Sequence, residues 1–277
     1  MHDSQRLLAL YTPTLFECSA KDLKSAQRIK QKYRERWRSM KDAIDRTGVF
    51  SAQTCVFDLL WRASENDAAA IAFLEGIDAT AKEALAATSG LAHTQMKNLI
   101  VKIIISFGGT QSQYKNHLAE LATVTKLIKE KNVQLLTVEK LLPNGNRIDF
   151  ELVSDLKPAL VEVYNIDFAI EKLGNSDDLR TFLDRRIVGK IKDKFEGLDP
   201  EDFDWIIVPV LWGNIKELRK YIEAFEYFKK GGILSPFMMI AEYVSVRNEY
   251  LYDFGTVEFF LQKEEEILRA KSRQSLP

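Results

Sequence analysis

The chain has 277 residues, of which 46% are hydrophobic and 29% are charged, enough for one large globular domain or two smaller ones. Its formal net charge of −1 gives no overall basic signal for nucleic acid. Two cysteines, Cys18 and Cys55, are too few for a disulfide framework or for a zinc site of their own. The N-terminus lacks a signal-peptide pattern, and the longest apolar run, 99–107, is too short to cross a bilayer. We therefore expect a cytoplasmic protein that does not enter a membrane.

Residues 1–110 are predicted to form an all-helical domain. Good helix formers fill the segments 21–44, 51–63, 67–88 and 91–107, and the sequence Gly-Gly-Thr at 108–110 ends the pattern. Residues 21–46 contain ten lysines and arginines against four acids, a local charge of +6. This basic helix could follow phosphates while Tyr33 and Trp37 stack on bases. The alternative, which we favour, is that both aromatic side chains face the core.

Residues 111–277 are predicted to form an α/β domain. The pattern indicates a helix at 113–131, strands at 133–142, 147–153 and 159–166, a helix at 176–195, and a buried strand at 204–212. A helix at 215–232 and strands at 237–246 and 249–255 follow, and the sequence Pro-Asn-Gly-Asn at 143–146 is typical of a hairpin turn. This order predicts a mixed sheet. A doubly wound nucleotide-binding sheet is excluded because the chain lacks its glycine-rich phosphate loop.

Three acids occupy notable positions in this order. Glu120 lies in the helix, Asp149 in the second strand and Glu162 in the third. Adjacent strands lie about 4.8 Å apart, so acids on one face can approach closely, and a helix across the sheet can add a third carboxylate. Such a cluster needs a cation because like charges raise one another's pKa, and Mg²⁺ prefers oxygen ligands. Alternatively, each acid is an ordinary solvent-facing residue.

The segment from Glu120 to about Trp212 resembles the PD-(D/E)XK nuclease superfamily, which has the restriction-endonuclease-like fold. The family core runs α-β-β-β-α-β, with a glutamate in the first helix, an aspartate in the second strand and Glu-x-Lys in the third. Glu120, Asp149 and Glu162 match these acids, but the chain has tyrosine in place of the lysine. The resemblance implies metal-dependent cleavage of nucleic acid, DNA in preference to RNA, in restriction, repair or anti-phage defence. It also implies that the three acids hold Mg²⁺ or Mn²⁺, assisted by the Val163 carbonyl, and that the protein works as a homodimer or with a partner protein.

Tyr164 stands where the family has its lysine. It can donate a hydrogen bond, but it carries no positive charge and is a poor base at neutral pH, since an ordinary tyrosine has a pKa of about 10. A lysine from elsewhere could replace the missing one. We assign Lys190 to the catalytic set; Lys194 lies one helical turn further on the same face as Lys190 and Arg186, and Lys172 is a further candidate. Each of these could instead be a solvated surface residue.

Two other functions remain open on the sequence alone. Without a replacement lysine, the chain would be a catalytically lapsed nuclease-like protein that serves as a nucleic-acid-binding or protein-interaction subunit. If the acids do not converge, it would be an unrelated α/β binding protein. His117 lies three residues before Glu120 and shares its helix face, so the two could hold a transition metal, or His117 could contact substrate. No motif supports a serine or cysteine nucleophile.

Overall fold

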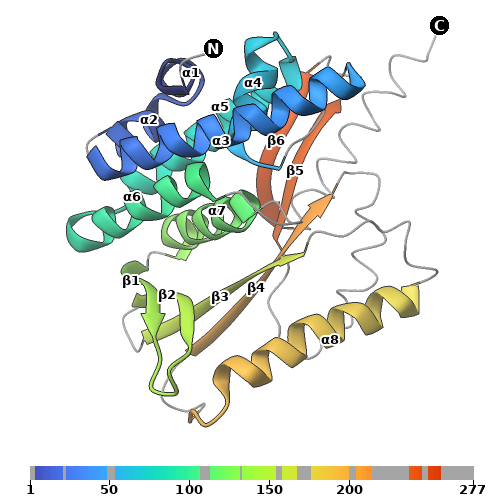
Figure 1. The fold of residues 1–277 in the computed structure, drawn as a ribbon. Helices are drawn as coiled ribbons and strands as arrows, with labels where there is room; N and C mark the ends of the chain where they lie inside the picture. The colour runs from blue at the N-terminus through green and yellow to red at the C-terminus, as the bar shows by residue number, and fades with distance from the viewer. Residues whose placement is uncertain are drawn as a thin grey trace, which may run out of the picture. The chain divides into compact units, whose positions relative to one another are not determined.

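The computed structural model describes residues 4–20, 23–48, 54–106, 113–131, 133–153, 158–166, 176–199, 204–213, 237–244 and 249–256 (Figure 1). The chain divides into two compact units, Met1–Thr125 and Lys126–Pro277. This division falls inside helix α7 (Gln113–Lys131), whereas the predicted domain boundary precedes that helix. The first part of α7 joins the helical unit because the fully buried Tyr114 packs its ring against Phe73, 6.4 Å away.

The described residues of the first unit form helices and no strands, as predicted. The helices before α7 are α1 (Ser4–Tyr11), α2 (Pro13–Ala20), α3 (Leu23–Thr47), α4 (Val56–Ser64), α5 (Ala68–Ala86) and α6 (Gly90–Ile105). Asp67 caps α5 by accepting hydrogen bonds from the amides of Ala69 and Ala70, which satisfies donors that have no partner within the helix.

A buried ion pair joins α3 to α4. Asp58 has no exposed surface, and Arg36 donates two hydrogen bonds to its carboxylate, at 2.7 and 2.9 Å. Thr54 donates two more, from its amide and its hydroxyl, both at 2.8 Å. This carboxylate is therefore fully satisfied inside the helical unit, as a buried charge must be.

The second unit contains a mixed sheet, as predicted. Its elements are β1 (Gln134–Leu141), β2 (Arg147–Val153), β3 (Pro158–Ile166), α8 (Ser176–Phe195), β4 (Asp204–Gly213), β5 (Phe237–Val244) and β6 (Glu249–Thr256), and the strands lie in the order β1-β2-β3-β4-β5-β6. Strands β1, β2 and β3 pair antiparallel, β3 with β4 and β4 with β5 pair parallel, and β5 with β6 antiparallel. Helix α8 supplies the crossover that a parallel β3–β4 pair requires. The predicted helix at 215–232 lies outside the described residues.

The β1–β2 hairpin holds the C-terminal end of α8. Gly145 adopts a φ of 85° in its turn, a conformation that glycine reaches without strain. The side-chain amide of Asn144 donates to the carbonyls of Lys194 and Glu196, both at 3.0 Å. That of Asn146 donates to the carbonyls of Asp193 and Lys194, at 3.1 and 3.0 Å. The carbonyls at the end of a helix lack partners within the helix, and these bonds supply them. Figure 1 shows the hairpin reaching this end of α8.

Apolar contacts reinforce the same junction. Leu142, Ile148 and Leu160 form a buried cluster against which Phe195 and Leu198 pack. Hydrogen bonds and apolar burial together therefore fix the last turn of α8 against the sheet. In the described part of the chain, no helix has both the length and the apolar character needed to cross a membrane.

Candidate functional site

Asp149 and Glu162 lie next to each other on strands β2 and β3. The pairing of the two strands ends at Phe150 and Val161, so the two acids are the next residue on each strand. At this point the Asp149 Oδ2 accepts a hydrogen bond of 2.7 Å from the amide of Val163. The Asp149 carboxylate thus lies against the backbone of the residue that follows Glu162. A second-strand aspartate and a third-strand glutamate are in this way brought to one place.

Glu162 is buried in the sheet and is paired with a lysine. Only 6% of the residue is exposed, and the Lys194 ammonium group donates a hydrogen bond to its Oε1. Lys194 lies in the last turn of α8, where the helix dipole favours a positive charge. The amide groups of Asn144 and Asn146 both bind the Lys194 carbonyl. The hairpin therefore fixes the backbone from which this ammonium group reaches Glu162.

Tyr164 lies on the same face of β3 as Glu162, because strand side chains alternate. It is buried, with 4% exposed. Burial raises the pKa of its hydroxyl above the ordinary tyrosine value, and the negative charges of Glu162, Asp149 and Asp193 raise this pKa further. Tyr164 is therefore a neutral phenol at any physiological pH. It can donate a hydrogen bond within the acidic cluster, but it cannot supply the positive charge of the missing lysine.

One of the candidate lysines lies at Glu162, and the assignment of Lys190 to the catalytic set stays a prediction. Lys190, assigned to the catalytic set, lies in α8, but its side chain and that of Arg186 are outside what the structure describes, as is all of Lys172. Lys194, the alternative one turn later, contacts Glu162. The signal in the sequence was the spacing of four residues, which places both lysines on one helix face without choosing between them.

Glu120 belongs to the helical unit. There its Oε2 lies 3.2 Å from the Nδ1 of His117, as their spacing in the helix predicts. Its predicted place beside Asp149 and Glu162, which belong to the other unit, stays a prediction.

The donor set of the site suits a hard divalent cation. No group of three or more His, Cys, Asp or Glu side chains that could hold a metal ion occurs among the described residues. Asp149, Glu162 and the Val163 carbonyl nevertheless supply only oxygen ligands. Mg²⁺ keeps several waters and is commonly bound by one or two carboxylates. Two neighbouring carboxylates therefore fit Mg²⁺ or Mn²⁺, whereas the absence of histidine and cysteine in this pair disfavours zinc.

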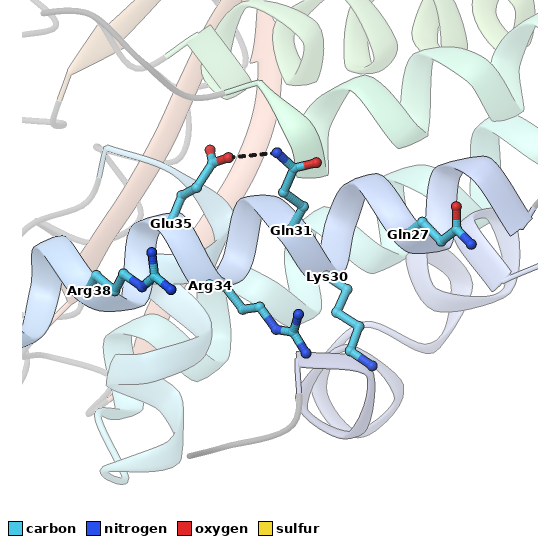
Figure 2. A pocket seen from close by; sticks show the side chains of 6 residues that line it. All are labelled: Gln27, Lys30, Gln31, Arg34, Glu35 and Arg38. Atoms are coloured by element: carbon cyan, nitrogen blue, oxygen red, sulfur yellow. Dashed lines mark hydrogen bonds between the residues drawn. The ribbon is translucent and has the colours of Figure 1, made fainter.

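The basic helix α3 has one face of exposed cations. Lys30, Arg34 and Arg38 follow one another at four-residue intervals and line a shallow hollow with Gln27, Gln31 and Glu35. Figure 2 shows Lys30 and Arg34 on one side of this hollow and the hydrogen-bonded Gln31 and Glu35 on the other. Cations at this spacing can contact successive phosphates.

The aromatic residues of α3 pack against rings of α4, and Tyr33 is buried in the core, as in the interpretation that we favoured. Tyr33 is 3% exposed, and its ring lies edge-on to Phe57 at 5.5 Å. Trp37 packs against Trp61 at 4.7 Å. Tyr33 is therefore not available as a platform for stacking bases, whereas Trp37 is half-buried.

Comparison with known proteins assigns no family to this chain. No protein-family model matches the chain, and neither the curated proteins nor the solved structures gave a match.

Proposed function

We propose that the chain is a metal-dependent nuclease with a restriction-endonuclease-like core, which cleaves phosphodiester bonds in DNA in preference to RNA. The contact of Lys194 with Glu162, beside Asp149, carries this proposal. It brings two acids and a lysine together although the third strand has Tyr164 in the lysine position. The antiparallel β1-β2-β3 meander followed by α8 and the parallel β4 supports the same core.

Each residue of the site has a distinct role in this proposal. Asp149 and Glu162, with the Val163 carbonyl, would hold Mg²⁺ or Mn²⁺, which would supply polarisation of a phosphate oxygen and activation of a water molecule. Lys194 places a positive charge where negative charge develops on the phosphate, and it orients water through its N–H groups. Tyr164 contributes a neutral hydrogen-bond donor next to the two carboxylates.

Other parts of the chain support binding of the same substrate. Lys30, Arg34 and Arg38 of α3 contact phosphates of the nucleic acid without reading its sequence. A role in restriction, repair or anti-phage defence, as a homodimer or with a partner protein, belongs to this proposal. So does a cytoplasmic location, with which Cys18 and Cys55, neither of which forms a disulfide, are consistent.

A cleavage assay with matched carboxylate variants tests the proposal. We expect the native protein to cut DNA in Mg²⁺ or Mn²⁺, and D149N and E162Q to lose a factor of about 10² to 10³ or more in rate. The control is E151Q, because Glu151 lies on the same strand but binds Lys140 at 2.9 Å and has no part in the proposed site. Equal cleavage by the native protein and D149N would mean that the activity comes from a contaminant.

The second candidate function is a lapsed nuclease-like protein that binds nucleic acid or a partner protein. The observation that favours it is Tyr164, which burial keeps neutral at the position of the family lysine. In that case the native protein binds nucleic acid without cutting it. The variant Tyr164→Lys separates the two candidates: a gain of cleavage from an inactive native protein would show an intact site that has lost its chemistry.

A further inference from the structure

A basic pocket lies within the helical unit, between α3, α6 and α7. It has a volume of about 400 Å³. Its polar lining consists of Arg28 and Lys32 from α3, Lys102 from α6, Ser106 directly after α6, and Gln113 and His117 from α7. Three of these side chains are permanent cations at neutral pH, and no described lining residue is acidic. The pocket is therefore suited to an anion.

The local sequence explains why these cations gather. Arg28 and Lys32 are four residues apart, so they share one face of α3. Lys102 lies in the last turn of α6, where the helix dipole favours a cation. Gln113 opens α7, and the first amides of a helix lack partners within it and attract anions. Two acids contact lining residues: Glu35 lies 3.2 Å from Lys32, and Glu120 lies 3.2 Å from His117. They offset part of the charge of the three cations that line the pocket.

We propose that this pocket binds a phosphate group. A guanidinium, two ammonium groups, a hydroxyl and an amide are the donors that recognise phosphate oxygens. The volume falls in the range of about 300 to 1,000 Å³ that is typical of small-molecule sites, so it admits more than the phosphate alone. Arg28 and Gln113 are exposed, so the rest of the ligand can extend into solvent. The phosphate belongs either to a nucleic-acid backbone or to a free nucleotide.

Binding measured in EDTA tests this site without any cleavage. One arm measures the anisotropy of a fluorescein-labelled oligonucleotide, and the other measures calorimetric binding of ATP. The pocket variant is R28Q/K102Q. The control is R6Q/K82Q, which likewise removes one arginine and one lysine, from exposed positions of the helical unit outside the pocket and outside the proposed phosphate-contacting face of α3. We expect the pocket variant to bind at least about tenfold more weakly in one arm, and the control to change by less than about threefold.

The salt dependence of oligonucleotide binding is a second measurement. A purely structural effect of the substitutions would leave it unchanged. In the oligonucleotide arm, each phosphate-contacting cation that is removed should reduce the slope of log affinity against log salt by about one. A loss confined to the oligonucleotide assigns the phosphate to nucleic acid, and a loss confined to ATP assigns it to a nucleotide. If the double variant does not retain the native helical circular dichroism signal, the single variant R28Q, at an exposed position, repeats the test.

Three results would overturn the proposal: no binding by the native protein in either arm, no loss in the pocket variant, or equal losses in the pocket and control variants. The last would show only a general effect of net charge. No binding of the oligonucleotide by the native protein would also count against nucleic acid as the substrate. The other two results leave the nuclease proposal untouched, because cleavage at Asp149 and Glu162 is measured separately in Mg²⁺. The phosphate site and the nuclease proposal can thus fail independently.

Discussion

The Lys194–Glu162 ion pair can be tested by its contribution to stability, whether or not the protein is an enzyme. The variant K194M removes the ammonium group but keeps most of the apolar stem. The Glu162 side chain is 8% exposed and the Lys194 side chain 22%. Removing one partner of a fully buried pair costs about 3 to 5 kcal/mol, whereas an exposed pair contributes about 0.2 to 1 kcal/mol. We expect an intermediate loss for K194M, of about 1.5 to 3 kcal/mol in the free energy of unfolding.

Urea unfolding of a double-mutant cycle measures the interaction itself. K194M/E162Q should lose less stability than the sum of the single variants, by about 1 to 2 kcal/mol. A second cycle, K140M/E151Q, is the control, because Lys140 is 38% exposed and its coupling with Glu151 should therefore be smaller. Additivity within about 0.5 kcal/mol for the Lys194–Glu162 cycle would refute the contact on which the candidate site is built.

Two further predictions concern buried groups of the helical unit. R36M leaves the Asp58 carboxylate, which has no exposed surface, without its cation, so the free energy of unfolding in urea should fall by about 3 to 5 kcal/mol; a loss below about 1 kcal/mol would contradict the geometry. Burial, and secondarily the charge of Asp58, raises the pKa of the Cys55 thiol to about 12. A raised pKa favours the protonated thiol, which is unreactive. Ellman's reagent at pH 8 should therefore label Cys55 in guanidinium chloride and not in the native protein, and rapid native labelling would disprove this environment.

Much of the fold followed from patterns that are local in the sequence. Helix-forming residues and apolar periodicity predicted α3 to α6, whereas no separate segments were assigned for α1 and α2. The turn at 143–146 predicted the β1–β2 hairpin. The near-continuous apolar run at 204–212 indicated a buried strand, which pairs in parallel with β3. Strand spacing also indicated that Asp149 and Glu162 could meet, because neighbouring strands of a hairpin bring their residues together in a fixed register.

The features that the sequence did not reveal depend on contacts between distant residues. The choice between Lys190 and Lys194 depends on how the end of α8 sits on the sheet. That end is held by Asn144 and Asn146 through bonds that span 47 to 52 residues, for which no local pattern exists. The bond from the Val163 amide to Asp149 likewise depends on where the β2–β3 pairing ends. Neither contact leaves a periodic signal in the chain.

The cleavage rates of K194M and K190M in Mg²⁺ test the central claim most directly. The claim is that Lys194 supplies the positive charge that Tyr164 cannot. We predict that the native protein cuts DNA, that K190M retains this activity, and that K194M loses a factor of about 10² to 10³. Equal rates for the native protein and K194M, or a loss in K190M alone, would contradict the claim.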